Sequence, residues 1–363
     1  MNPNPPGIDA TGQPFNDARP DRCRPADQLS PPMEKSLVNS LRLLRLPLNM
    51  VERNGLVVPD TSGKGTFGAE VTGGFPLRGY APPCLPEQLG DPGFCLDLGI
   101  RYPYLGGSMA KGISSTALVE ELGRGGMLGF FGAAGLPLTE VEAAIDRLAG
   151  SLGKIPHGFN LIHSPHEPEL EKELASLYIK KGVRLVEASA FLDLTLPLVR
   201  YMVYGIHRLP DGTIATPNRI IAKVSREELA AKFLSPPPET LLRELVADGE
   251  ITMEQADLAG QIPVAGIVTA EADSGGHTDN RPAIALFPTI HSLAARLTER
   301  YGYDRKLFIG LAGGISTPAA AAAAKLPVVP PANQPREVGP PWFLRRPASS
   351  AASRRKQISR PRM

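Results

Sequence analysis

The sequence lacks the features that mark several classes of protein. Its 363 residues contain only three cysteines, Cys23, Cys84 and Cys95, which excludes a disulfide framework, and no Cys-x-x-Cys pair is present to hold zinc. The first thirty residues contain no apolar run, so no secretory signal is predicted. The longest uncharged stretch, 307–324, is broken by Gly-Gly, Ser-Thr and Pro, which favours a strand, a loop and a helix over a membrane span. We therefore expect a cytoplasmic protein without a membrane partner.

The charge is small overall but uneven along the chain. The formal net charge is +2, yet the segment from Lys325 onward holds nine basic residues, one acidic residue and eight prolines. This composition predicts a disordered, basic, proline-rich tail over 325–363. The rest of the chain is acidic on balance, so nucleic acid is not an expected partner. With 42% hydrophobic residues the chain can bury a sizeable core, which excludes wholesale disorder.

Composition and turn signals divide the chain into four parts. Residues 1–32 are rich in proline and polar side chains and are expected to form a disordered leader. Residues 33–97 are expected to form a small N-terminal cap that begins with a short helix. The cap contains two apolar runs around Asn54-Gly55, a dipeptide typical of a two-residue hairpin turn. Residues 98–324 form the main domain, and the basic tail follows it.

Within the main domain, short apolar runs alternate with helical patterns. The seven expected strands cover 104–110, 127–131, 158–162, 185–187, 220–224, 266–270 and 307–311. Thr139-Glu-Val-Glu and Ser164-Pro-His-Glu have the pattern of a helix start, and Ser225 is expected to begin another helix. Continuous apolar strands separated by helices indicate buried parallel strands with right-handed crossovers. The sequence therefore predicts an α/β fold, a (β/α)8 TIM-type barrel whose eighth strand is missing.

In such a barrel, functional side chains lie where the carboxyl end of each strand meets the following loop. The first strand ends in Gly-Gly-Ser-Met-Ala at 106–110, where paired glycines allow a flat ligand to approach the backbone, with an ordinary tight turn as the alternative. The third strand carries Asn160 and is followed by His163 and His166. Two histidines at this spacing could hold a metal, but no third ligand is apparent, so no metal is predicted and Asn160 is the expected ligand contact.

The last two strands are followed by the most polar and the most glycine-rich loops. Nine of the thirteen residues in 269–281 carry polar side chains, and two glycines there adjoin the titratable His277. A buried structural network would explain this cluster, but the combination favours a functional site. The seventh strand is followed by Gly313-Gly314, with Pro318 opening an alanine-rich helix. Backbone amides at a helix N-terminus in this position are typical of a phosphate site.

Taken together, these loops resemble the flavin-dependent nitronate monooxygenase (2-nitropropane dioxygenase) superfamily of FMN barrels. The resemblance is strongest to its branch of trans-acting enoyl reductases, which serve polyunsaturated fatty acid and polyketide synthases. In chain order the motifs are Gly-Gly-Ser-Met-Ala-Lys-Gly-Ile-Ser at 106–114, Phe-Asn-Leu-Ile-His-Ser-Pro at 159–165, Glu-Ala-Ser-Ala-Phe at 187–191, Ala-Lys-Val-Ser at 222–225, Glu-Ala-Asp-Ser-Gly-Gly-His-Thr-Asp-Asn-Arg at 271–281 and Ala-Gly-Gly-Ile-Ser-Thr at 312–317. The extended form of the Gly-Gly-His motif points to the enoyl reductase branch.

The resemblance implies that FMN binds across the mouth of the barrel. The implied cofactor-binding residues are Gly107, Ser108, Met109, Ala110, Asn160, Lys223, Glu271, Ser274, Gly275, Gly276, Gly313 and Gly314. The loop 107–110 would line the isoalloxazine ring, and the glycine pairs would hold the ribityl phosphate. A cationic Lys223 would stabilise negative charge on the reduced flavin. His277 would face the substrate as an acid, a base or an orienting group.

For the reaction, the resemblance implies that NADPH reduces FMN and that hydride then passes to an enoyl thioester. The acyl substrate would be carried by an acyl carrier protein, which makes that carrier a partner. A nitronate monooxygenase-like oxidase and a truncated, inactive barrel are the alternatives. The chain departs from the family after Ala324, where neither strand nor helix periodicity continues. The barrel is therefore expected to be open, with unpaired edges on its first and last strands, and to bind FMN weakly.

Overall fold

The structure is a computed structural model, which describes residues 22–24, 33–62, 64–66, 74–165, 167–273, 278–313, 315, 317 and 343–345. The chain divides into two compact units, 1–86 and 87–363. The sequence predicts a boundary at residue 97 instead. The difference arises because the helix α2 (Pro92–Leu98) packs inside the second unit, although its seven residues follow a stretch without periodicity.

The first unit is a small antiparallel sheet with one helix. Its elements are β1 (Arg22–Arg24), α1 (Met33–Arg42), β2 (Leu48–Arg53), β3 (Leu56–Asp60), β4 (Lys64–Thr66) and β5 (Phe75–Ala81), and the strand order is β3-β2-β5-β1-β4. The predicted hairpin is confirmed, since β2 pairs with β3 around Asn54 and Gly55. Both turn residues have positive φ angles, 51° and 78°, as a type I′ turn requires.

The second unit contains seven parallel strands that follow one another around a barrel. They are β6 (Tyr104–Gly106), β7 (Leu128–Phe131), β8 (Gly158–Ile162), β9 (Leu185–Ser189), β12 (Arg219–Val224), β13 (Ile267–Glu271) and β14 (Phe308–Ala312). The predicted TIM-type fold is confirmed. The predicted strands coincide with these within two residues, except that β6 ends at Gly106 because the chain turns there into the loop 107–114.

Two short strands lie in segments where the sequence predicts none. β15 (Phe343–Arg345) pairs in parallel with both β14 and β6, and it closes the ring of strands that was expected to stay open. β1 lies within the expected leader and pairs with β4 and β5. Three residues are too few to produce a periodic pattern, and backbone pairing needs no particular side chain. The remainder of the expected leader and tail lies outside the described residues.

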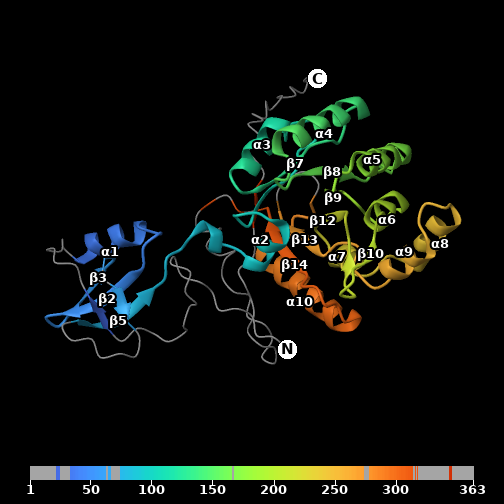
Figure 1. Ribbon diagram of the computed structural model, residues 1–363. Coiled ribbons are helices and arrows are strands. Elements are labelled where there is room, and N and C mark those ends of the chain that lie inside the picture. Colours follow the sequence, from blue (N-terminus) through green and yellow to red (C-terminus); the bar gives the residue numbers. More distant parts are fainter. Residues whose placement is uncertain are drawn as a thin grey trace, which may run out of the picture. The chain divides into compact units, whose positions relative to one another are not determined.

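A ring of helices surrounds the barrel strands (Figure 1). The helices are α3 (Thr116–Arg124), α4 (Leu138–Leu152), α5 (Pro168–Lys181), α6 (Leu196–Val203), α7 (Glu227–Phe233), α8 (Glu239–Ala247), α9 (Met253–Ala259) and α10 (Ala283–Tyr301). A two-stranded hairpin, β10 (His207–Arg208) with β11 (Ile214–Ala215), follows α6. The capping box predicted at Thr139 does not form, because α4 begins at Leu138 after Pro137. The capping box in the structure joins Thr252 and Gln255 at α9. No helix in the described part of the chain is long and apolar enough to cross a membrane.

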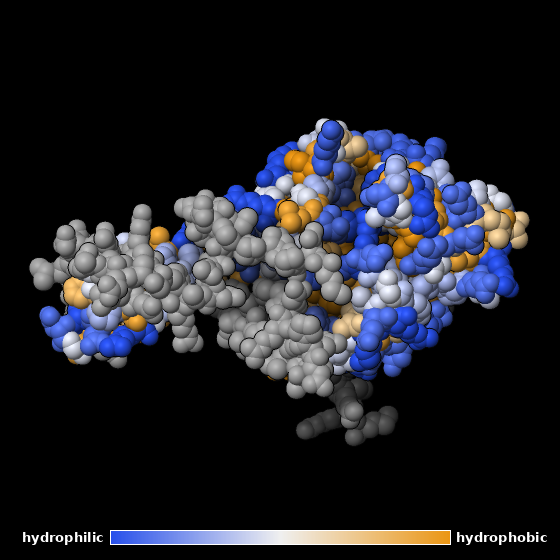
Figure 2. Space-filling view, turned by 60° about the horizontal axis from the view of Figure 1, so that its bottom comes forward, coloured by the Kyte–Doolittle hydropathy of each residue, from blue (hydrophilic) through white to orange (hydrophobic). Residues whose placement is uncertain are grey.

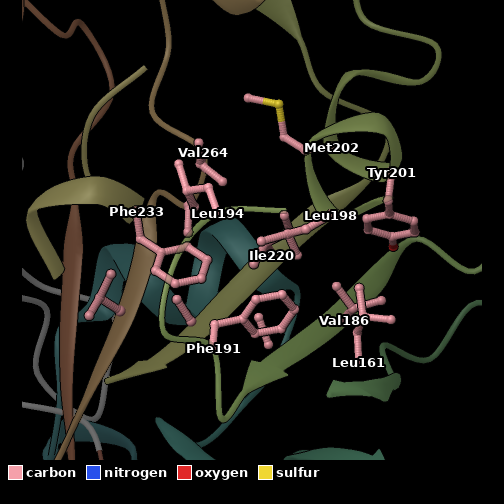
Figure 3. Close-up of a cluster of buried hydrophobic side chains, with 14 of the residues drawn as sticks. Leu161, Val186, Phe191, Leu194, Leu198, Tyr201, Met202, Ile220, Phe233 and Val264 are labelled. Atoms are coloured by element: carbon pink, nitrogen blue, oxygen red, sulfur yellow. The ribbon is translucent and has the colours of Figure 1, made fainter. Parts of the chain in front are cut away.

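Two hydrophobic clusters hold the barrel together. The larger one lies between the strands and the helices, where Phe191 and Phe233 meet edge to face at 6.1 Å (Figure 3). The smaller one fills the lower end of the barrel, where Phe94 of α2 packs edge to face on Phe308 of β14 at 5.6 Å. Arg219 fixes α2 further by donating to the backbone and the carboxylate of Asp97. The outer surface is mainly hydrophilic, with hydrophobic side chains visible between the helices (Figure 2).

Candidate functional site

The barrel interior changes from apolar to polar toward the carboxyl ends of its strands. Side chains two residues apart on a strand point to the same face, so the change can be followed along single strands. On β9, Leu185 belongs to the apolar lower layer and Glu187 follows it. On β12, Ile221 is likewise followed by Lys223. The buried charges therefore lie at the end of the barrel where TIM-type enzymes carry out their chemistry.

A buried ion cluster occupies the centre of this polar layer. The Lys223 ammonium lies 3.2 Å from Oε1 of Glu271 and 3.9 Å from Oε1 of Glu187. The exposed fractions of the three side chains are 2%, 7% and 0% respectively. Moving such charges out of water costs several kcal/mol per ion, so a buried cluster of this kind is weak support for stability alone. Its two carboxylates and one ammonium carry one excess negative charge when all three are ionised.

Ser108 connects this cluster to the loop after β6. Its backbone N–H donates to Oε2 of Glu187 at 2.7 Å, and its hydroxyl donates to the same oxygen. Ser114 shapes the loop from within, because its hydroxyl donates to the carbonyl of Gly107 and accepts from the backbone N–H of Met109. Three of the predicted residues, 107–109, thus lie in a loop tied directly to the polar layer. Ala110, the fourth, is exposed at the end of that loop.

Gly132 allows the loop to lie close to the end of β7. A Cβ atom at this position would lie 1.6 Å from the carbonyl oxygen of Met109, a contact no side-chain carbon can make. The backbone N–H of Gly112 donates to the carbonyl of Gly132, and the N–H of Gly132 donates to the carbonyl of Ser114. The position of the loop is therefore set by backbone contacts that only glycine permits.

Asn160 of β8 lies in the same layer and is 3% exposed. Its side-chain N–H₂ group donates to the carbonyl of Glu187 at 3.3 Å and to the hydroxyl of Ser189 at 3.4 Å. The carbonyl of Asn160 accepts from the hydroxyl of Tyr178, and burial raises the pKa of that phenol well above its ordinary value. Asn160, Lys223, Glu271 and Ser108 are thus brought together, as the sequence predicts.

The polar loop after β13 is anchored at its described ends. The Asp279 carboxylate accepts from the Arg226 guanidinium at 2.7 and 2.8 Å and from the Ser225 hydroxyl at 2.7 Å. These bonds, the Arg226 bond first, lower the pKa of Asp279 to about 2. Asp273 N–H donates to the carbonyl of Arg281 at the base of the loop. The predicted residues Ser274, Gly275, Gly276 and His277 lie outside the described residues.

The phosphate site predicted after β14 is described in part. Gly313 follows the strand directly and has a φ of 83°, a left-handed conformation that favours glycine. The carbonyl of its neighbour Ala312 accepts from the backbone N–H of Ala272, which joins the loops after β13 and β14. Gly314 lies outside the described residues.

The polar layer contains side-chain oxygens that lack hydrogen-bond partners. Oε1 of Glu187 and Oγ1 of Thr269 are both buried and accept or donate no hydrogen bond within the described residues. Buried polar atoms are nearly always paired, so these two indicate that a ligand with its own donors and acceptors completes the layer. The polar edge of a flavin ring fits this requirement, because it carries alternating donors and acceptors.

A second buried polar pair lies near the end of β8. Nδ1 of His163 is 2.8 Å from Oε2 of Glu171, and Oε1 of Glu171 accepts from the Thr195 hydroxyl. The His163 ring also stacks on Phe191, with ring centroids 5.4 Å apart. His166 lies outside the described residues, and no cluster of three metal-binding side chains occurs among the residues that are described.

Three residues of the layer are absent from the set predicted as cofactor ligands, namely Glu187, Thr269 and Ser114. Glu187 has a usable signal in the sequence, because it is an acidic residue inside the apolar run Leu-Val-Glu-Ala-Ser that forms β9. Thr269 and Ser114 have none, since threonine and serine occur readily in strands and turns. Their roles depend on contacts with residues far along the chain.

No family model matches the sequence. Two curated proteins are similar to the barrel: a component of the polyunsaturated fatty acid synthase of Thraustochytrium sp., 49% identical over 244 residues, and polyketide biosynthesis protein PksE of Bacillus subtilis, 46% identical over 239 residues. The matches cover 67% and 66% of this chain but 16% and 31% of those proteins, so the chain spans less than a third of either relative. Among solved structures, the enoyl reductase domain of MlnA from Bacillus amyloliquefaciens aligns with a TM-score of 0.63 and 42% identity, over 65% of this chain and 54% of that one.

Proposed function

Because this chain belongs to the same family of TIM-type barrels as the MlnA enoyl reductase domain and PksE, we propose that it is an FMN-dependent enoyl reductase. Its substrate would be an enoyl thioester on an acyl carrier protein of a polyunsaturated fatty acid or polyketide synthase. The observation that carries the proposal is the buried layer of Ser108, Glu187 and Lys223 at the carboxyl end of the barrel. Such a layer destabilises the fold unless it serves a ligand.

The described residues would hold the flavin in a definite orientation. The loop 107–110 lines the ring, and Asn160 and Thr269 offer side-chain groups to its polar edge. Gly313 supplies a backbone amide toward the phosphate, together with Gly314, Gly275 and Gly276 from the neighbouring loops. When bound, FMN supplies hydride transfer from NADPH to the β-carbon of the enoyl thioester.

Lys223 acts in this layer as part of a cluster. With carboxylates at 3.2 and 3.9 Å, its positive charge is already compensated, and the layer carries an excess of negative charge. Lys223 therefore orients a ligand by donating hydrogen bonds and does not create a net positive potential. This differs from the role of a lone cation, which the resemblance implied. Glu187 in turn fixes both Lys223 and the loop that bears Ser108.

The reduction needs a proton at the α-carbon after hydride reaches the β-carbon. His277 is the proposed donor, or it holds the thioester oxygen while the proton arrives. The loop that carries His277 is fixed at its flank by the ion pair of Asp279 with Arg226. An acyl carrier protein is the proposed partner, because the synthase proteins similar to this chain build acyl chains.

The proposal is tested on the full chain with FMN added and the excess removed. A bound-flavin absorption spectrum is expected, followed by NADPH oxidation that depends on crotonyl-pantetheine and yields the butyryl thioester. A protein that stays colourless would favour the inactive barrel and overturn the proposal. Oxygen uptake with an alkyl nitronate, but no turnover with the enoyl thioester, would establish the oxidase alternative instead.

The role of His277 is tested with a matched pair of variants. His277→Gln is expected to lower kcat by about 10²–10⁴-fold, the usual contribution of a general acid, while the flavin spectrum stays unchanged. His207→Gln is the control, because His207 is exposed in the hairpin strand β10. Equal activity of the two variants would exclude His277 as the proton donor.

A further inference from the structure

A cavity of 210 Å³ lies beside the polar layer, between the loop after β7 and the first half of α5. Most of its lining is apolar. The apolar residues that line it are Ala134, Leu136, Leu138, Ile162, Leu170 and Leu174. The cavity is bounded by segments that continue directly from the carboxyl ends of β7 and β8, so it opens at the end of the barrel that carries the site.

The polar groups in the cavity wall are engaged with one another. Glu171 is buried with a side-chain exposure of 3%, and its two oxygens accept from His163 and from the Thr195 hydroxyl. The His163 ring is held on its face by Phe191, which itself packs into the hydrophobic core (Figure 3). Because these groups satisfy each other, the wall presents mainly hydrocarbon to an occupant.

Backbone hydrogen bonds join the cavity to the polar layer. Lys111 N–H, in the loop that carries Ser108, donates to the carbonyl of Ala134 at 2.7 Å. His163 N–H donates to the carbonyl of Ser189, whose hydroxyl accepts from Asn160. Both walls of the cavity are thus fixed to residues that border the site, and a molecule bound at the site can extend into the cavity.

The size of the cavity selects among occupants. A volume of 210 Å³ holds about seven groups the size of a water molecule or methylene at ~30 Å³ each. FMN is several times larger, and a small polar molecule would leave the apolar wall uncovered. An unbranched hydrocarbon segment matches both the volume and the lining.

We propose that this cavity binds the hydrocarbon tail of the acyl thioester and sets the chain length that the protein accepts. The inference rests on the proposed function, since it assumes a thioester at the polar layer. Each methylene that enters an apolar cavity raises affinity about fourfold, the fold-change to which 0.8 kcal/mol corresponds. Four further methylenes in the cavity are then expected to raise affinity on the order of 100-fold.

The test compares short and long chains by binding as well as by turnover. Calorimetry on the FMN-saturated chain measures Kd for butyryl- and octanoyl-pantetheine, which are saturated and cannot react. Ala134→Leu fills the cavity, so the octanoyl preference should fall at least about tenfold while butyryl affinity changes less than about twofold. Leu138→Ala enlarges the cavity and should move the preference toward longer chains. Ala247→Leu, at an exposed position on α8, should leave both affinities unchanged.

Opposite shifts in the two cavity variants cannot result from a general folding defect, which would weaken both thioesters alike. Equal binding of butyryl and octanoyl thioesters by the unaltered protein would overturn the inference, as would an unchanged preference in Ala134→Leu. If binding discriminates chain length but no enoyl thioester is reduced with NADPH, the enoyl reductase proposal fails while the acyl site stands. Reduction without any chain-length preference would leave the enoyl reductase proposal standing and overturn the acyl site.

Discussion

The lower and upper halves of the barrel interior are built by the same strands yet have opposite physical character. On β9 and β12, the residues Leu185 and Ile221 pack with Phe94 of α2 in a dry apolar layer. Two residues further, Glu187 and Lys223 place charges in an equally buried position. The lower half stabilises the fold by burying apolar surface, whereas the upper half costs free energy that only a bound ligand would offset.

Truncation in the lower half should have the largest effect on stability. Phe94→Ala removes a fully buried ring that packs on Phe308, and it is expected to lower the free energy of unfolding by about 4 kcal/mol. Leu96→Ala on the same helix is the control, since that side chain is 84% exposed and should change stability little. Urea unfolding measures both. Similar losses in the two variants would show that α2 does not fill the barrel as described.

Breaking the charge cluster in the upper half should have the next largest effect. Lys223→Met leaves the carboxylates of Glu187 and Glu271 buried together, at an expected cost of about 3 kcal/mol. It should also abolish the flavin absorption band that the proposed function predicts. Lys232→Met removes an exposed lysine paired with Asp193, and that variant should lose less than about 1 kcal/mol. A Lys223→Met protein that unfolds like the unaltered chain would remove the contrast between the two halves.

A smaller effect tests the rim above the polar layer. The pKa of Asp279 is about 2, below its ordinary value of 3.8, so its ion pair with Arg226 stabilises the folded chain above about pH 4. That contribution is lost as the pH falls toward 2, because the carboxylate then binds a proton. For an exposed pair it amounts to about 1 kcal/mol at most. The stability difference between the unaltered chain and Asp279→Asn should therefore shrink from pH 6 to pH 3, and a constant difference would contradict the assignment.

The smallest expected effect is on reactivity and not on stability. Burial, with a further contribution from Asp91, raises the pKa of the Cys95 thiol in α2 to about 11. At pH 8 its thiolate fraction should be about 100-fold lower in the folded chain than after unfolding, and alkylation should slow accordingly. Mass spectrometry of the Cys95 peptide measures the rate with and without urea. Rapid alkylation of the folded protein would mean that α2 leaves the barrel readily.

Local patterns predicted the elements that carry a strong local signal. The seven strands are apolar runs of a length typical of buried parallel strands, and the hairpin at Asn54-Gly55 follows from two residues that tolerate positive φ. The strand β15 and the helix α2 were not predicted, because neither has a periodic pattern and each is stabilised by contacts with distant strands. The helix start predicted at Thr139 fails for a similar reason, since Pro137 begins α4 earlier.

The candidate site was predicted only in part. The polar loops indicated Ser108, Asn160, Lys223 and Glu271, and these residues do lie together. Glu187 joins them in the structure, although only its motif and not its role was expected. The contribution of His277 and of the glycine pair beside it stays a prediction, because these residues lie outside the described part of the chain.

By itself, the sequence determined which segments become strands, their parallel arrangement and the end of the barrel that carries polar residues. These properties follow from hydrophobic periodicity and from the short range of turn and strand preferences. Only the tertiary structure decided that Lys223 lies between two carboxylates, that α2 fills the lower end of the barrel and that an apolar cavity lies beside the polar layer. Each of these depends on distances between residues far apart in the chain, and no local pattern encodes such a distance.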